Sequence, residues 1–225
     1  MGRNRRSNAE FPKHYRAIVK LLILCGQRRG EVAALRTSFV DGDLATLPAE
    51  LCKNGLQHTF PLPILAQKIL REVDIDATHS DVLFFPARGK PDKPFNGWSK
   101  AMKELRKVIG TDFKHFTLHD IRRTFRSGLA MLGVRPDIAE RLVNHISAQS
   151  DMELVYDLYE YLPEMREAIK KWEDYIRMVI SATGSISCST PHRATNVFPV
   201  PHAITTCARS DFAKVAVMFP SAVFW

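Results

Sequence analysis

Two Asx-Gly dipeptides lie inside a chain whose apolar residues otherwise recur at helical spacing. Asp41-Gly42 separates two short apolar runs, and Asn54-Gly55 separates the second run from a third. Such dipeptides supply the positive φ angles that tight hairpin turns require. We therefore predict an antiparallel sheet of about three strands, over residues 38–40, 44–47 and 57–62, within a mainly helical α+β fold.

Apolar positions three or four residues apart predict helices on both sides of this sheet. The first helix runs from about Phe11 to Cys25 and is interrupted by Gly26, and a second extends from Arg28 to Leu35. Further along, Thr117 suits an N-cap and Gly133 a C-terminal stop. The other predicted elements are a short buried strand or extended segment over 82–86 and helices over 63–73, 96–109, 117–132, from 136 onward (with Pro136 in its first turn), 153–161 and 163–180.

Length and charge narrow the class of protein. The 225 residues fit one domain of ordinary size, or one domain plus an appendage. A formal charge of +8 and a pI near 9.5 favour a polyanionic partner, most commonly nucleic acid. Residues 1–9 are predicted to be a basic flexible arm. Residues 181–225 contain much Ser, Thr and Pro and only four charged residues, so we predict a low-order tail of unknown role.

Several classes of protein are disfavoured by the same sequence. The cysteines match no zinc-site spacing and are predicted to be reduced thiols in a cytosolic protein. We find no apolar run long enough to cross a bilayer. The apolar stretch Ala17–Cys25 begins late, contains Lys20 and lacks a small-residue cleavage site, so we expect no signal peptide. The cysteines are Cys25, Cys52, Cys188 and Cys207.

Six residues along the chain carry side chains suited to attacking a phosphodiester without a metal ion. Arginine neutralises charge on the non-bridging oxygens with a planar fork of donors. A lysine beside a turn can protonate a leaving oxygen, and histidines can transfer protons or donate hydrogen bonds. A tyrosine becomes a nucleophile when nearby cations favour its phenolate. The six residues are Arg28, Lys53, His119, Arg122, His145 and Tyr156.

Taken singly, each of these residues has a simpler interpretation as exposed charge, helix-cap decoration, interface or core histidine, or tyrosine packing. His119 and Arg122 are three residues apart at a helix start, so they lie on one face and can reach one phosphate. The helix N-terminus adds partial positive charge there. Glu31 follows Arg28 by three residues and could hold its side chain in place. Only the joint occurrence of the six residues favours phosphodiester chemistry.

The order of these motifs resembles the catalytic domain of the tyrosine recombinases, the phage integrase family. The resemblance covers roughly residues 10–180 and predicts one catalytic domain over that range. Cys25-Gly-Gln-Arg-Arg-Gly-Glu resembles the family's first arginine motif, and Lys53 with Phe60-Pro-Leu-Pro resembles its lysine hairpin. Leu118-His-Asp-Ile-Arg-Arg-Thr-Phe resembles the His-x-x-Arg box, and Leu142-Val-Asn-His resembles the Leu-Gly-His box, with Asn144 in place of glycine. Val155-Tyr-Asp-Leu-Tyr-Glu-Tyr-Leu resembles the segment that carries the nucleophile.

The resemblance implies a site-specific recombinase that integrates or excises a mobile element. It implies double-stranded DNA as partner, a homotetramer on that DNA, and no cofactor, metal, membrane or small-molecule substrate. It also implies a cytoplasmic, nucleoid-associated protein encoded by a bacterium or phage. The implied roles are phosphate binding for Arg28 and Arg122, general acid for Lys53, proton transfer for His119, a hydrogen bond to the phosphate for His145, and the 3′-phosphotyrosyl link for Tyr156.

Departures from the family pattern keep alternatives open. The chain starts almost at the catalytic domain, without the family's usual N-terminal DNA-binding domains, and its end does not resemble the family's C-terminal helix. The loop 147–151 lengthens the spacing from His145 to Tyr156, which makes Tyr159 an alternative nucleophile. The alternative functions are a catalytically inactive DNA-binding remnant, a relaxing nuclease or topoisomerase-like enzyme, and a helical protein-interaction domain.

Overall fold

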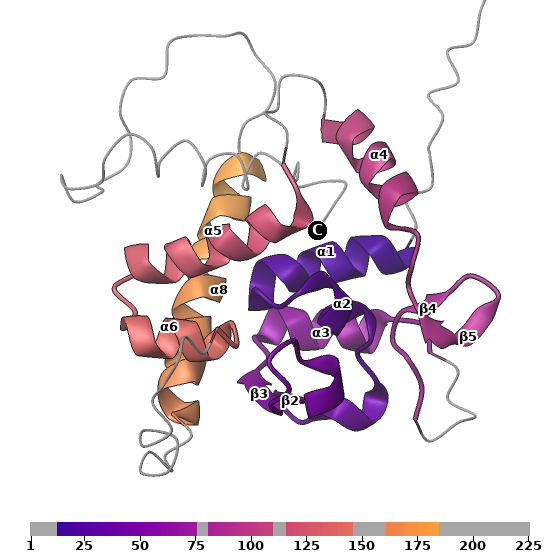
Figure 1. Cartoon of the computed structure of the whole chain (residues 1–225). Coiled ribbons are helices and arrows are strands. Elements are labelled where there is room, and N and C mark those ends of the chain that lie inside the picture. Colours follow the sequence, from indigo (N-terminus) through magenta and orange to yellow (C-terminus); the bar gives the residue numbers. More distant parts are fainter. Residues whose placement is uncertain (1–12, 76–80, 110–115, 146–160, 185–225) are drawn as a thin grey trace, which may run out of the picture.

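Helix α1 lies at the centre of the molecule because most of its surface is apolar. In the computed structural model, which describes residues 13–75, 81–109, 116–145 and 161–184, Leu21 to Cys25 of this helix are all buried. A helix that is apolar around its circumference must be covered on all sides. Helices α2, α3, α5 and α8 pack around it (Figure 1). The elements are α1 (Lys13–Cys25), α2 (Arg29–Ala33), the 3₁₀ turn η1 (Thr37–Phe39), β1 (Val40–Asp41), β2 (Leu44–Leu47), the 3₁₀ turn η2 (Ala49–Leu51), β3 (His58–Pro61), α3 (Ile64–Glu72), β4 (Pro86–Ala87), β5 (Lys90–Pro94), α4 (Trp98–Ile109), α5 (Leu118–Met131), α6 (Pro136–Leu142) and α8 (Leu162–Gly184).

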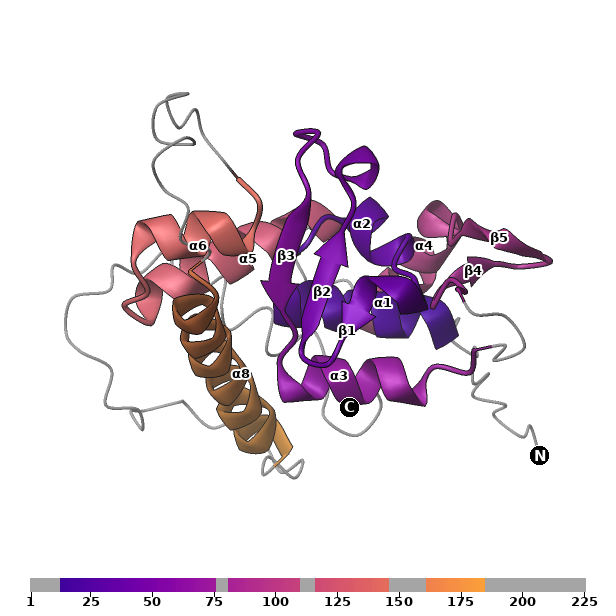
Figure 2. The same ribbon diagram turned by 90° about the horizontal axis from the view of Figure 1, so that it is seen from below.

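The predicted antiparallel sheet is confirmed, with strand order β1-β2-β3. Asp41 pairs with Leu44, so the tight turn consists of Gly42 and Asp43, one residue later than predicted. Gly42 has a φ of +57°, as such a turn requires. Residues 38 and 39 were predicted in the first strand but form part of η1. Figure 2 shows the strands side by side, with α5 and α6 on one flank and β4–β5 on the other.

A second, two-stranded sheet of β4 and β5 was not predicted from the sequence. Strand β5 reads Lys-Pro-Asp-Lys-Pro and is exposed along its whole length. Proline and charged residues disfavour strands, which leaves Gly89, with a φ of +69°, as the local signal for the turn. The predicted extended segment 82–86 is present: Phe84 and Phe85 are buried, and Leu83 pairs with Arg36 in an isolated bridge.

The helix predictions with clear end signals are confirmed. Thr117 caps α5 in a reciprocal pair with Asp120, and α5 ends just before Gly133, whose φ is +73°. Pro136 opens α6 as predicted. Helix α2 is shorter than expected, and α8 extends past the predicted end at residue 180. The arm 1–9, the predicted helix 153–161 and most of the tail lie outside the described residues.

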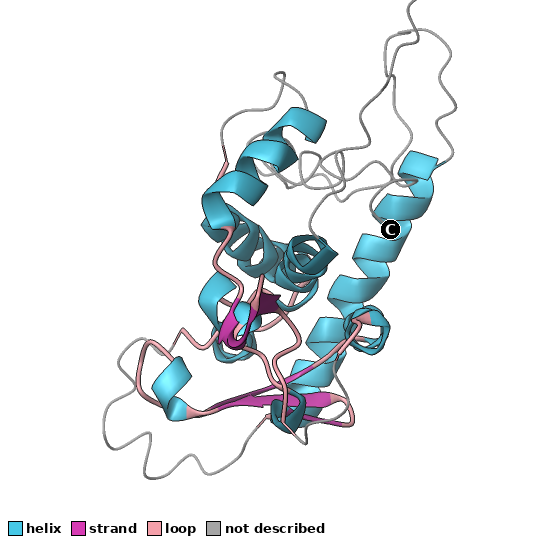
Figure 3. Ribbon diagram, turned by 90° about the vertical axis from the view of Figure 1, so that its right-hand side faces the viewer, coloured by secondary structure: helices cyan, strands magenta, loops and turns pink. Residues whose placement is uncertain are grey.

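Helix α8 ties the two ends of the described chain together. Trp172 is 1% exposed, donates from Nε1 to the carbonyl of Ile23 at 2.8 Å, and packs edge-on against Phe125. Glu173 is also buried, and its carboxylate accepts hydrogen bonds from the backbone N–H groups of Ile64 and Leu65 at 3.1 and 2.7 Å. A negative charge is favourable at this N-terminal end of α3. Figure 3 shows α8 as the long helix along one side of the molecule.

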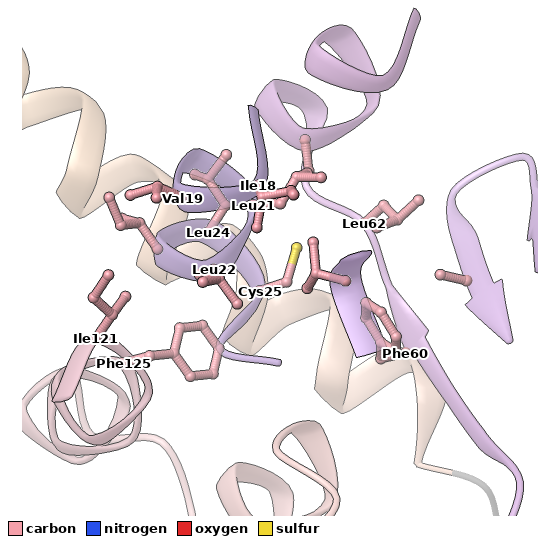
Figure 4. Packing of buried hydrophobic residues seen from close by; sticks show 14 of the residues in the cluster. Ile18, Val19, Leu21, Leu22, Leu24, Cys25, Phe60, Leu62, Ile121 and Phe125 are labelled. Atoms are coloured by element: carbon pink, nitrogen blue, oxygen red, sulfur yellow. The ribbon is translucent and has the colours of Figure 1, made fainter. Parts of the chain in front are cut away.

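Gly26 joins α1 to α2 at a point where no side chain fits. Its φ is +66°, and a Cβ atom built there would lie 2.2 Å from Cδ1 of Phe125. The aromatic ring of Phe125 lies beside this bend, among the apolar residues of α1 (Figure 4). The sharp bend places residues 27 and 28 next to the ends of α5 and α6, where the candidate site is found. None of the helices in the described part of the chain has the length and apolar character needed to cross a bilayer.

We predict that Gly26→Ala destabilises the fold more than Gly42→Ala. Both residues have a positive φ, which costs an alanine about 1–2 kcal/mol. Only Gly26 lies against an aromatic ring, whereas a Cβ at Gly42 meets no atom within 4 Å. The clash at Gly26 adds about 1–3 kcal/mol of overpacking. Urea denaturation of both variants measures the difference, and equal losses would contradict the role assigned to the ring of Phe125.

Candidate functional site

Arg28 is held rigidly where α2 begins. Its backbone N–H donates to Oε2 of Glu31 at 2.9 Å, and its Nη1 donates to Oε1 of the same carboxylate at 2.7 Å. The side chain of Glu31 is only 3% exposed, while that of Arg28 is 25% exposed. The prediction that Glu31 fixes Arg28 is therefore confirmed. The guanidinium is oriented by a buried carboxylate but keeps one side open to solvent.

Arg122 lies in the second turn of α5 and is 8% exposed. Its Nη1 donates to the carbonyl of Gly26 at 3.0 Å, and its Nη2 donates to the carbonyl of Val143. Burial, together with the positive charge of Arg28, lowers the pKa of this guanidinium to about 10. The two arginines are thus close enough to repel each other, as expected of a pair that binds one anion.

The C-terminal end of α6 is the element that gathers these side chains. Asn144 adopts a left-handed conformation with a φ of 47°, and the N–H groups of Asn144 and His145 close the helix on Arg141 and Glu140. This is a Schellman ending, in which asparagine replaces the more usual glycine.

Three successive carbonyl groups at this end of α6 point away from the helix and need donors. Gln27 Nε2 donates to Leu142 at 2.7 Å, Arg122 donates to Val143, and Arg28 Nη2 donates to Asn144 at 3.2 Å. The negative end of the helix dipole lies at the same place and favours the two positive charges.

The turn that carries Lys53 is connected to this point. The N–H of Gly55 donates to the carbonyl of Cys52 at 3.0 Å, so Lys53 and Asn54 form the middle of a tight turn. Asn54 Nδ2 donates to Oδ1 of Asn144 at 2.7 Å. Lys53 itself is exposed. The turn that carries the backbone of Lys53 is therefore held at Asn144, whose carbonyl binds Arg28, and the Lys53 side chain is exposed to solvent.

The two candidate histidines differ in their surroundings. His145 Nδ1 lies 2.9 Å from Oε2 of Glu140, and the other oxygen of that carboxylate accepts from Arg126 Nε at 2.8 Å. This pairing orients the imidazole ring beside the end of α6. His119 is exposed in the first turn of α5, next to Asp120. Tyr156 and its alternative Tyr159 lie outside the described residues.

His58 and Gln27 belong to the site and were missed by the sequence analysis. His58 is 6% exposed and stacks on Phe60, and its Nε2 has no hydrogen-bond partner among the described residues. Burial lowers the pKa of His58 to about 4, and the charges of Arg122 and Arg28 act in the same direction. The alternation of strand β3 indicates that His58 points inward, but nothing local in the sequence indicates the two arginines as its neighbours.

The arrangement is suited to binding an oxyanion. Two guanidinium groups converge from different helices, and each is already oriented by groups that need no rearrangement. Within residues 13–75, 81–109, 116–145 and 161–184, we find no cluster of three or more His, Cys, Asp or Glu residues that could hold a metal ion. Arg28 and Arg122 supply positive charge to the site.

Comparison with known proteins identifies a family for this arrangement. Residues 4–154 match the phage integrase family. That range contains Arg28, Lys53, His119, Arg122 and His145 and ends two positions before Tyr156. The matched range is about two thirds of the chain.

A Haemophilus influenzae protein named "Putative integrase/recombinase" is 27% identical over 149 residues. The alignment covers 66% of this chain but only 36% of that relative, so the chain spans about a third of the relative's length. No solved structure was found to match the chain.

His58 predicts a loss of stability in acid. Its folded-state pKa of about 4 lies below the ordinary value of 6.5, so the unfolded chain binds the proton first as the pH falls. Stability is then lost between about pH 6.5 and pH 4, by up to about 3 kcal/mol. We expect His58→Phe to reduce this slope, as measured by urea denaturation at pH 7 and pH 4.5. Parallel pH profiles for the two proteins would contradict the assignment.

Proposed function

This chain belongs to the phage integrase family, and from that premise we propose that it cleaves and rejoins double-stranded DNA in site-specific recombination. The proposed role is integration or excision of a mobile element. The observation that carries the proposal is the convergence at the end of α6 of Arg28 and Arg122, which lie in the segments that resemble the family's two arginine motifs. The reaction would take place in a homotetramer on DNA, in the cytoplasm of a bacterial host.

The proposed chemistry uses an attack in line with the leaving group. Tyr156 gives its phenolic proton to His119, and its Oη forms a bond to phosphorus while the bond to the 5′ oxygen breaks, which leaves a 3′-phosphotyrosyl link. Arg28 and Arg122 bind the non-bridging oxygens, where negative charge grows. Lys53 gives its proton to the 5′ oxygen. A 5′ hydroxyl from another strand then attacks the link and releases the tyrosine, so the bond energy is conserved and no cofactor is required.

The anchors on both sides of residues 146–160 support a nucleophile from this segment, for which the motif match favours Tyr156 over Tyr159. His145 precedes this segment at the end of α6. Tyr161 follows it, and Arg141 of the same short helix lies over its ring at 4.3 Å. Tyr156 is five residues from Tyr161, and five extended residues span at most about 18 Å. This length limits how far Tyr156, and equally Tyr159, can lie from Tyr161, whose ring contacts Arg141 of α6.

Helix α4 extends the positive surface away from the arginine pair. Arg29 follows Arg28 and lies over the ring of Trp98, the first residue of α4, at 5.4 Å. Lys100 and Lys103 are exposed on the following turns of the helix. A duplex whose phosphate is held at the arginine pair would pass over cations on this side, which supports DNA as the substrate.

We predict that a covalent protein–DNA adduct forms on a suicide substrate. The substrate is a duplex with the element's own end sequence. It is nicked beside the cleavage point, so that the short fragment that carries the released 5′ hydroxyl is lost after cleavage. The adduct should be absent for Tyr156→Phe and present for Tyr159→Phe. Because Arg122 binds the developing charge, Arg122→Ala should lower its rate of formation by about 10²–10³-fold. A denaturing gel measures all four proteins.

Each other outcome of that experiment has a definite meaning. Loss of the adduct in Tyr159→Phe alone moves the nucleophile to that residue. DNA binding without any adduct supports the inactive remnant and overturns the proposed reaction. Relaxation of a supercoiled plasmid by the wild-type chain, with no joining to a partner duplex, supports the topoisomerase-like activity.

We predict that Lys100→Gln and Lys103→Gln weaken DNA binding and lower its salt dependence. Each lost phosphate contact should reduce the slope of log K against log salt concentration by about 0.9. The matched control is Lys170→Gln on α8, whose ammonium group is 3.0 Å from Asp174 and lies on a helix far from α4 (Figure 2). Fluorescence anisotropy at several salt concentrations measures the slopes. An equal effect of the control would exclude α4 as a specific contact surface.

A further inference from the structure

We propose that Asn54 and Asn144 are positioning residues for Lys53. Their amide groups form a clasp that holds the Lys53 turn at the arginine pair, so that the ammonium group meets the leaving 5′ oxygen. The inference rests on the proposed function, because it requires Lys53 to act as the general acid. The position of the Lys53 ammonium group would then depend on two side-chain amides that do not themselves take part in the reaction.

The clasp is a reciprocal pair of amide hydrogen bonds. Asn54 Nδ2 donates to Oδ1 of Asn144 at 2.7 Å, and Asn144 Nδ2 lies 3.4 Å from Oδ1 of Asn54. Both amides therefore use a donor and an acceptor on each other. Asn144 is 4% exposed, and an amide buried this deeply costs about 1–3 kcal/mol if its hydrogen bond is lost. The pair is accordingly favoured over an open hairpin.

The backbone of Asn144 belongs to the phosphate site at the same time. Its carbonyl accepts the hydrogen bond from Arg28 Nη2 at 3.2 Å, and the preceding carbonyl accepts from Arg122. Asn144 therefore contacts both parts of the site: its side-chain amide holds the hairpin, and its backbone carbonyl holds Arg28. A shift of the hairpin would break the clasp before it disturbed the arginines.

The hydrogen bonds within the turn fix the backbone of Lys53 relative to Asn54. The backbone bond from Gly55 to Cys52 closes the turn, and Oδ1 of Asn54 also accepts the N–H of Leu56 at 3.3 Å. Lys53 lies directly before Asn54 in this rigid turn, so its Cα is fixed when the clasp is closed. The Lys53 side chain can then reach fewer positions than it could from a mobile turn. Misplacement of a reacting group by about 1 Å can cost about 100-fold in rate.

Asn144→Gly isolates the clasp from the rest of the site. Glycine adopts the positive φ of this position without strain, so the helix ending and the carbonyl for Arg28 are retained. Asn54→Ala removes the other half of the clasp at an exposed position and leaves the amide of Asn144 without this partner. Asn144→Asp keeps an acceptor for Asn54 Nδ2 and should show an intermediate defect. Thermal unfolding of each variant checks that the fold is intact.

The decisive measurement compares two suicide substrates that differ in one atom. In one of them sulfur replaces the bridging 5′ oxygen at the cleaved bond. When the tyrosine attacks, the P–S bond breaks and sulfur leaves as a thiolate, which needs no proton because thiols have a pKa of about 8.5. We expect Asn144→Gly and Asn54→Ala to form adduct about 10- to 100-fold more slowly than wild type with oxygen. With sulfur, we expect them to match wild type within about threefold.

Lys53→Ala separates the two levels of the proposal. If sulfur restores Lys53→Ala and both clasp variants, Lys53 is the general acid and the clasp positions it. If sulfur restores Lys53→Ala but leaves the clasp variants slow, the clasp serves only the structure and the inference is overturned. The inference is also overturned if the clasp variants equal wild type with oxygen. If sulfur does not restore Lys53→Ala, the role proposed for Lys53 itself fails.

Discussion

The carbonyl groups at the end of α6 are the constraint on which the site depends. A helix leaves its last carbonyls without partners inside the helix, and a buried end must find them elsewhere. Here the donors are Gln27, Arg28 and Arg122, which come from the bend after α1 and from α5. Satisfying one helix end therefore assembles two guanidinium groups that the sequence separates widely. The left-handed conformation of Asn144 ends the helix at this point.

Gly26 is the second residue whose backbone conformation brings the two arginines together. Its conformation bends the chain sharply enough for residues 27 and 28 to meet α6, and its carbonyl binds Arg122. The ring of Phe125 fills the space that a Cβ atom would need, and Trp172 of α8 packs against that ring. The core and the site are thus continuous: the packing that excludes a side chain at Gly26 also fixes the position of Arg28 and Arg122.

Local signals in the sequence account for the parts of the fold that were predicted correctly. Thr117 and Gly133 define α5 through capping and φ preferences that need only neighbouring residues. Strand β5 was missed because prolines and charges oppose a strand, and only pairing with β4 creates it. The clasp between Asn54 and Asn144 joins positions 90 residues apart, and its members look like an ordinary turn and an ordinary helix end. Contacts of this kind arise only when the whole chain folds.

The lowered pKa of Arg122 reflects its burial beside a second positive charge, that of Arg28. A buried guanidinium beside another cation is unfavourable without an anion, and the carbonyls and Glu31 offset only part of this cost. In the proposed reaction, a bound phosphodiester would supply the missing negative charge, and the charge that builds up during the attack would supply more. The repulsion between Arg28 and Arg122 would then be relieved progressively toward the transition state. Binding of this kind lowers the barrier instead of merely tightening the complex, because the interaction grows as the reaction proceeds.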